Sequence, residues 1–466
     1  MMGFLKSPDT ALHTIEILTP FPHPFQNANM AQLPPAPDMH PITDAHFVHP
    51  EKRVLSNGVP LYAIDGAADD ILKLEAVFPA GRRYETAPGV SAAAAKLMTE
   101  GAPGLNGSAI AETVERYGAS LKVRGGFDYT TLQLQGLNRF LDRLLPVVHG
   151  IVYEASYPEK ECANYVRNNR QKIKIREQKV DYLADNGMRE ALYGPQHPYG
   201  YKMTGELFSS LTRQSFLDHH RRTIAQSQPF LIAAGRITDQ VLDFAEAAFG
   251  RAVRMPIAAT PYGAAQPAAT LNIHQFKLGS VQSALRFAKP IMAKSHEDYR
   301  PFFVLNTILG GYFGSRLMSN IREDKGYTYG IYSGMTHLDD ASYFYISAEV
   351  GSHVCQPAIT EVYAEMQRLR DIPVGDEELD LVRNYLLGTI LGSIDGPFRT
   401  ADTVRGILQG HLPMDYVQQL VDTIRTVTPV QLQALANRYL RQDDLLELVV
   451  GWPEEATVLG ANGVGV

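Results

Sequence analysis

The chain has 466 residues, of which 45% are apolar and 20% are charged, a balance typical of soluble globular proteins. Its 43 basic and 50 acidic residues give a net charge of −7, and no long run of Lys and Arg occurs. This balance disfavours nucleic-acid binding and binding to anionic membranes. The length predicts more than one domain, because a single hydrophobic core rarely serves more than about 250–300 residues.

The first forty residues are rich in proline and lack the apolar core of a secretory signal, so we expect an extended arm or a disordered tail. No stretch reaches the roughly 18 apolar residues that suggest a membrane span. The two cysteines, Cys162 and Cys355, are far apart and make no disulfide framework. We therefore expect a soluble protein, cytoplasmic by preference, or periplasmic if a signal was removed before residue 1.

After this arm, apolar residues alternate over 73–81, which predicts a strand that leads into a helix. A second helix is expected to begin at Ser108 and end at Gly118, with apolar residues at i, i+4 and i+7 on one face. Residues 129–137 alternate as a half-buried strand, and helical pattern follows near 159–192.

Residues 251–270 are rich in Ala and Pro, lack periodicity, and read as a linker. Beyond it, strands are expected at 281–290 and 341–350, and helices near 355–370 and 377–393. Strands and helices mix without strict alternation. The pattern indicates an α+β fold, with helices covering one face of a largely antiparallel sheet.

Residues 211–235 align with 427–451 at a constant offset of 216, without a gap. Each copy has a threonine suited to a helix N-cap (Thr212 and Thr428), an amphipathic helix, a polar turn and a short strand ending in glycine. An offset of this size indicates duplicated domains, although chance similarity of two helix–strand units is the alternative. The predicted plan is an arm at 1–50, a first domain at 51–250, the linker at 251–270, a second domain at 271–456 and a tail at 457–466.

The most informative text is "LGGYFGSRLMSNIREDKGYTYGIYSG" at 309–334, a glycine-rich turn, a helix, a charged turn and a tyrosine-rich strand. It resembles the C-terminal half of pitrilysin/insulinase-type zinc metallopeptidases, in particular their short two-domain, processing-peptidase-like branch. "LSNGVPLYAIDG", "FPAGRRYE", "HPYGY" and the duplication extend this resemblance over nearly the whole chain after about residue 50. It implies two homologous domains of a metallopeptidase-like α/β roll.

Active members of that family carry H-x-x-E-H on a helix, where two histidines four residues apart bind one zinc ion and the glutamate acts as general base. Here the preceding strand is expected at Phe78–Glu85, and the resemblance places the five motif positions at 92–96. The two ligand positions and the base position are Ala92, Lys96 and Ala95. An ammonium group opposes a dication, so these positions are degenerate and no metal ligand is expected there.

No shift of register recovers the motif, because no histidine occurs between His49 and His149. The resemblance also implies a later helical glutamate as third ligand, yet no carboxylate occurs from Cys162 through Ile175. The two losses agree. We therefore predict no cofactor in this chain, with zinc in a partner subunit.

The resemblance implies that the second domain supplies an Arg and a Tyr to the zinc site, here Arg322 and Tyr329. Both can donate hydrogen bonds to a peptide carbonyl and to the oxyanion that forms from it. The alternative is a solvated helix end for Arg322 and half-buried packing for Tyr329. The preceding turn either lines the substrate space or only permits tight packing; its residues are Gly310, Gly311, Tyr312, Phe313 and Gly314.

Other histidines are weaker candidates. His46 and His49 form an HxxH, which is either a metal pair or, as we prefer, two loop histidines. His219 and His220 are adjacent on a helix and point about 100° apart, so we expect them at the surface or its boundary. No nucleophile elbow, P-loop or dinucleotide fingerprint occurs in the sequence.

The favoured hypothesis is a non-catalytic subunit of a heterodimeric zinc metallopeptidase, which donates Arg322 and Tyr329 to a homologous zinc-bearing partner. The implied substrate is an extended peptide that adds a strand to a sheet edge, mainly on the partner. The alternative is a peptidase-derived scaffold without a proteolytic role. An independent peptidase is disfavoured.

Overall fold

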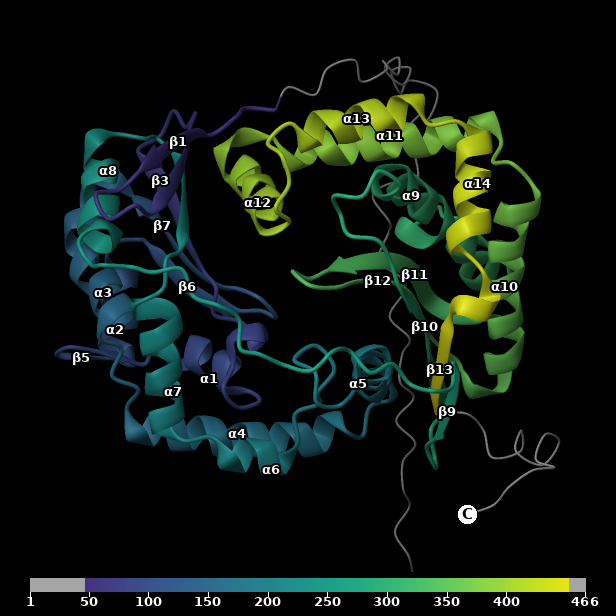
Figure 1. Ribbon diagram of the computed structural model, residues 1–466, viewed down its shortest axis with the longest axis horizontal. Helices are drawn as coiled ribbons and strands as arrows, with labels where there is room; N and C mark the ends of the chain where they lie inside the picture. The colour runs from purple at the N-terminus through teal and green to yellow at the C-terminus, as the bar shows by residue number, and fades with distance from the viewer. Residues whose placement is uncertain (1–46, 452–466) are drawn as a thin grey trace, which may run out of the picture. The chain divides into compact units, whose positions relative to one another are not determined.

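A computed structural model describes residues 47–451, and two sheets organise them (Figure 1). The predicted arm therefore lies almost wholly outside the described residues, as do the tail and His46. The first sheet has the strand order β1-β2-β8-β3-β7-β6. Its strands are β1 (Glu51–Val54), β2 (Pro60–Asp65), β3 (Ile71–Phe78), β6 (Ser120–Gly125), β7 (Thr130–Leu137) and β8 (Phe230–Gly235).

The second sheet has the order β11-β12-β10-β13-β9. Its strands are β9 (Asn272–Phe276), β10 (Gln282–Pro290), β11 (Thr328–His337), β12 (Ser342–Gly351) and β13 (Leu446–Gly451). A short hairpin, β4 (Gly101–Ala102) and β5 (Leu105–Asn106), stands apart from both sheets. The predicted strands at 73–81, 129–137, 281–290 and 341–350 thus all exist, within a few residues at their ends.

The two sheets repeat one topology, which confirms two homologous halves. β8 lies between a parallel neighbour, β2, and an antiparallel neighbour, β3, while β13 lies likewise between β9 and β10. The remaining pairs of both sheets are antiparallel. Thr212 and Thr428 each accept from the backbone of the residue three positions on and complete a capping box, as the aligned text predicted.

Helices cover these sheets, and those expected near 355–370 and 377–393 are confirmed. The helical pattern near 159–192 forms two helices, interrupted at 177–179. Among residues 47–451, no helix has both the length and the apolar character needed to cross a bilayer. The α-helices are α1 (Val90–Leu97), α2 (Gly107–Arg116), α3 (Leu141–Tyr153), α4 (Glu159–Arg176), α5 (Val180–Tyr193), α6 (Gly205–Ser210), α7 (Arg213–His220), α8 (Asp239–Ala245), α9 (Tyr299–Asn306), α10 (Cys355–Asp371), α11 (Asp376–Ser393), α12 (Gly396–Gln409), α13 (Tyr416–Thr426) and α14 (Pro429–Tyr439).

Each half also lends one helix to the sheet of the other. α5 of the first half packs on β10 and β13 of the second sheet, and α12 of the second half packs on β8 and β2 of the first. Gly187 on α5 permits this approach, because a Cβ there would lie only 3.0 Å from Leu448 Cδ1. The described residues consequently belong to one compact unit.

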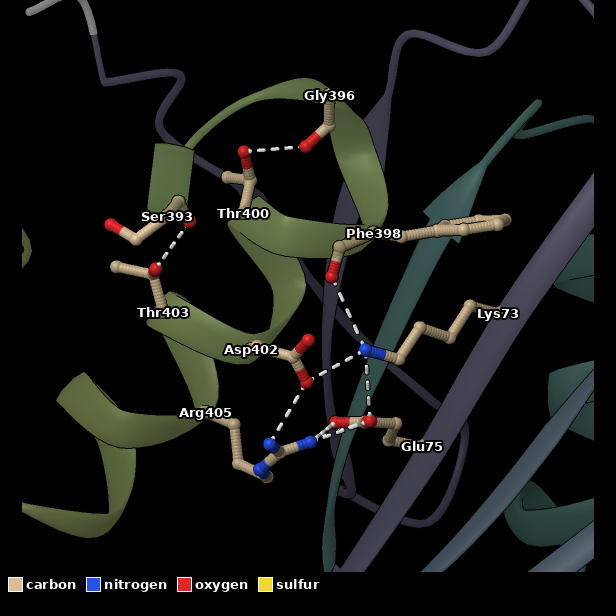
Figure 2. A network of polar contacts seen from close by, with 9 residues as sticks. All are labelled: Lys73, Glu75, Ser393, Gly396, Phe398, Thr400, Asp402, Thr403 and Arg405. Atoms are coloured by element: carbon tan, nitrogen blue, oxygen red, sulfur yellow. Dashed lines mark hydrogen bonds and ion pairs between the residues drawn. The ribbon is translucent and has the colours of Figure 1, made fainter. Parts of the chain in front are cut away.

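A network of charges, in which Glu75 and Lys73 are buried, lies where α12 meets β3 (Figure 2). The Glu75 side chain is 0% exposed, and its carboxylate lies 2.6 Å from the Arg405 guanidinium and 3.2 Å from the Lys73 ammonium. Asp402 contacts the same two cations at 2.8 and 2.9 Å, and Lys73 also donates to the carbonyl of Phe398 at 3.2 Å. The partners come from both halves, and removal of Arg405 would leave the buried Glu75 carboxylate with Lys73 as its one remaining ion-pair partner among the described residues.

The second half carries the reciprocal contact with its charges reversed. Glu75 lies opposite Ile232 and Arg286 lies opposite Leu448, and 232 plus the offset of 216 gives 448. Glu75 and Arg286 therefore occupy equivalent positions on β3 and β10. Arg286 pairs with Asp185 on α5 at 2.8 Å, so each sheet binds the helix lent by the other half through an ion pair.

Candidate functional site

Helix α1 carries the five positions where the resemblance places a zinc motif. Its buried face includes Ala93 and Ala94, whereas Ala92 and Lys96 are exposed. Residues four apart share one face of a helix, so the two ligand positions do point the same way. That face offers a methyl group and an ammonium group in place of two imidazoles, and the general-base position is the buried Ala95. These residues do not fit a zinc ion.

The expected strand Phe78–Glu85 is wrong after its first residue. β3 ends at Phe78, and residues Arg82–Tyr84 form a single turn of 3₁₀-helix. Pro79 has no N–H to continue the ladder. A Cβ at Gly81 would overlap the backbone of Phe127. Only glycine, which lacks a Cβ, allows the chain to turn this close to Phe127.

This turn delivers Glu85 to the start of α1. The buried carboxylate accepts hydrogen bonds from the Gly89 N–H at 3.2 Å and from the Ser91 N–H and hydroxyl at 2.9 and 2.6 Å. The Tyr201 hydroxyl donates to it at 2.7 Å, which joins the "FPAGRRYE" and "HPYGY" segments. Burial raises the pKa of Glu85. Glu85 thus caps α1 and fixes its orientation, a role that the sequence analysis did not assign.

The later helix, α4, gives no replacement ligand. Cys162 is buried on it, and Asn169 donates to the Tyr165 carbonyl at 2.8 Å within the helix itself. His49 packs edge-on against Phe47, with ring centroids 5.3 Å apart. Within residues 47–451, no three His, Cys, Asp or Glu side chains are grouped so that they could hold a metal ion.

Arg322 and Tyr329 lie on consecutive elements of the second half. Arg322 belongs to a π-helical segment, η7 (Met318–Asp324), and its guanidinium lies 4.6 Å from the centroid of the Phe313 ring. Tyr329 follows at the irregular start of β11, where the register with β12 shifts between Thr328 and Ile331. The Tyr329 side chain is 95% exposed, so it does not serve packing within the described residues.

The glycine-rich turn is buried at Gly310 and exposed at Phe313. Gly310 is buried against β11, where a Cβ would lie 2.7 Å from the Ser333 nitrogen. Phe313 is 63% exposed and carries the Arg322 guanidinium on its face. Tyr312 pairs its ring with Tyr385 at 4.8 Å. The contact between Phe313 and Arg322 was not predicted from the sequence, although both residues were candidates for the site.

The expectation that His219 and His220 lie near the surface is wrong. They are 2% and 3% exposed, and each ring donates through Nε2 to a backbone carbonyl, His219 to Ala80 at 3.2 Å and His220 to Ile151 at 2.9 Å. His219 faces the segment after β3 through Ala80, whereas His220 faces α3 through Ile151 and lies edge-on to Tyr157, so different segments cover the two rings. Adjacent residues on a helix both become buried when neighbours cover two faces.

This burial predicts acid sensitivity. The pKa of each of these two histidines is lowered from an ordinary 6.5 to about 4, chiefly because burial disfavours the imidazolium. Between those values the unfolded chain binds protons that the folded chain does not, so the free energy of unfolding falls as pH drops from 6.5 to 4. Urea unfolding at several pH values should show this slope, and His219→Gln should make it shallower. His353→Gln, at an exposed position, should leave the slope unchanged. An equal slope in the parent chain, His219→Gln and His353→Gln would contradict the prediction.

Comparison with known proteins connects this geometry to a family. Residues 210–386 match the family model described as "Peptidase M16 inactive domain". Over this region the chain resembles the M16 peptidases. The matched region contains the glycine-rich turn, Arg322 and Tyr329, and it excludes α1. The resemblance to pitrilysin/insulinase-type peptidases is thereby confirmed, and the comparisons support a non-catalytic member.

Relatives and solved structures agree with this resemblance. A protein of Bacillus subtilis (strain 168) named "Uncharacterized zinc protease YmxG" is 22% identical over 383 residues, covering 79% of this chain and 90% of the relative. A crystal structure described as a peptidase M16 inactive domain from Pseudomonas fluorescens has a TM-score of 0.80 at 22% identity, covering 87% of this chain and 99% of that one. A protease from Helicobacter pylori has a TM-score of 0.78 at 15% identity, covering 87% and 100%. These structures share the predicted α+β fold.

Proposed function

We propose that the chain is the non-catalytic subunit of a heterodimeric zinc metallopeptidase. The observation that supports the proposal is that the first half lacks metal ligands on α1, whereas the second half has an exposed hydrogen-bond donor. On α1 the exposed face at Ala92 and Lys96 has no group able to bind zinc, whereas Tyr329 extends a free hydroxyl into solvent. A chain that has hydrogen-bond donors but no metal ligands at these positions suits the role of a non-catalytic subunit paired with a zinc-bearing homologue.

In this proposal Arg322 and Tyr329 hold the peptide carbonyl and stabilise the oxyanion that forms during hydrolysis in the partner. Stacking on Phe313 supports such a role for Arg322, because the ring limits the orientations of the guanidinium while its N–H groups remain available. The only ion pair described for Arg322 is a long one of 3.8 Å to its neighbour Glu323. Its donors are therefore not consumed by a strong internal salt bridge.

The substrate in this proposal is an extended peptide, enclosed by both subunits. An exposed aromatic side chain near the two donors, Phe313, offers apolar surface to such a peptide. The partner supplies zinc, its ligands and the general base.

The test is reconstitution with a homologous H-x-x-E-H chain from the same organism. Each chain alone should cleave an unfolded reporter peptide poorly, and the mixture should cleave it well and co-elute as a heterodimer. If the chains associate but the mixture is no faster than the zinc-bearing chain alone, the scaffold alternative replaces the peptidase role. Absence of association would reject the heterodimer itself.

A further inference from the structure

A cavity of about 540 Å³ lies among hairpin and helix ends of both halves, at a place distinct from Arg322 and Tyr329, which do not line it. Its volume is in the range of small-molecule sites. The wall includes the turn between β6 and β7, the turn between β11 and β12, and the end of α12. The polar lining residues are Asp128, Tyr129, Lys294, His337, Asp339 and His411.

The acidic groups of this wall are already partnered. Asp128 accepts a short hydrogen bond from the Tyr199 hydroxyl and one from the Asp339 backbone N–H at 3.2 Å. Asp339 accepts from the Arg83 guanidinium and from the Tyr129 hydroxyl, both at 3.1 Å. Burial raises the pKa of Asp128 to about 6. Neither carboxylate forms an ion pair with Lys294 among the described residues.

The Lys294 ammonium in the cavity lining has no ion-pair partner among the described residues. Lys294 places its ammonium 5.2 Å from the centroid of the buried Tyr416 ring, and no carboxylate within residues 47–451 pairs with it. Burial lowers the pKa of Lys294. A desolvated charge without a counter-charge costs free energy, so this position favours an anion beside it.

His337 offers a second donor to the same cavity. Its Nδ1 lies 3.0 Å from the Ser342 hydroxyl, whereas its Nε2 is buried without a hydrogen-bond partner among the described residues. When Ser342 donates to Nδ1, the neutral ring carries its proton on Nε2. Burial and the neighbouring Lys294 lower the pKa of His337 to about 4, so the ring is neutral at physiological pH.

We propose that this cavity binds a small monocarboxylate, with its oxygens on the Lys294 ammonium and the His337 Nε2–H. One ammonium compensates one negative charge, while the carboxylates of Asp128 and Asp339 in the same lining disfavour a dianion. Free small carboxylates and the C-terminal carboxylate of a short peptide share this chemistry. The inference concerns the lone chain and stands whether or not a zinc-bearing partner exists.

Calorimetric titration of the full chain tests the site with three probes: acetate, N-acetyl-alanyl-alanine and the amide of that dipeptide. We expect saturable binding of a carboxylate and none of the amide. Tighter binding of the dipeptide than of acetate would identify a peptide C-terminus, and the reverse order would identify a free small acid. Failure of both carboxylates to bind would overturn the proposal.

Two variants locate the binding. Lys294→Met should weaken carboxylate binding by about tenfold or more, which corresponds to about 1.4 kcal/mol. Lys160→Met, at an exposed site on α4, should leave binding unchanged. His337→Phe keeps a ring of similar shape, removes the donor, and should also weaken binding. Unchanged binding by folded Lys294→Met or His337→Phe would contradict the assigned site.

The ligand-free variant provides an independent readout. Because Lys294→Met removes a desolvated charge that lacks an ion-pair partner, its thermal midpoint without ligand should equal or exceed that of the parent chain. Added carboxylate should raise the midpoint of the parent chain and not that of Lys294→Met. A large loss of stability in Lys294→Met would show that the ammonium is compensated internally, contrary to the proposal.

Discussion

Arg405→Met is expected to lower the free energy of unfolding by about 3–5 kcal/mol, the range found when one partner of a buried ion pair is removed. Glu75 would keep its negative charge in a site where its side chain is 0% exposed. Only Lys73, at 3.2 Å and shared with Asp402, would remain to compensate it. Urea denaturation monitored by circular dichroism measures this change as a shift of the midpoint urea concentration.

The matched control is Arg399→Met, because Arg399 is exposed on the same helix, α12. It should change stability by less than about 0.5 kcal/mol. Glu75→Gln in the Arg405→Met background should recover part of the loss, since it removes the buried charge that has lost its nearer counter-charge. If Arg405→Met and Arg399→Met had equal effects, the contact between the halves would not carry the stability assigned to it.

In the reconstituted heterodimer, Tyr329→Phe and Arg322→Ala should each lower kcat by about 10²–10³, the usual effect of losing one oxyanion donor. Tyr329→Phe removes only a hydroxyl from a side chain that is 95% exposed, so the fold should be unaffected. Because the hydroxyl acts mainly on the transition state, KM should change much less than kcat.

Tyr332→Phe is the control, since Tyr332 is also exposed on β11 and is not assigned as a donor. It should leave kcat within about threefold. Co-elution of each variant with the zinc-bearing chain separates lost assembly from lost chemistry. Full turnover by Tyr329→Phe and Arg322→Ala in an intact heterodimer would remove both residues from the mechanism.

The predictions from sequence were most accurate for features that depend on residues close together in the chain. Alternation of apolar residues located the main strands, and the two threonine caps followed from a local hydrogen bond between residues three positions apart. The helical pattern near 159–192 was recognised, but its interruption at 177–179 was not, because helical periodicity continues across it.

The errors arose where burial depends on distant segments. His219 and His220 were expected at the surface or its boundary because adjacent residues on a helix point about 100° apart, yet contacts with distant segments bury both. The end of the strand at Phe78 was likewise missed, since the close approach of Phe127 to Gly81 is a tertiary contact.

The sequence by itself determined the duplication, the α+β architecture and the residue types at 92–96, because periodicity, repeats and side-chain chemistry are properties of the text. Tertiary structure alone decided which charges meet. Glu75 and Arg405 are 330 residues apart, and Lys294 lacks an ion-pair partner within residues 47–451 only because of how its surroundings fold. Ion pairing and desolvation depend on distances of a few ångströms, and for residues so distant in sequence the packing of whole elements sets those distances.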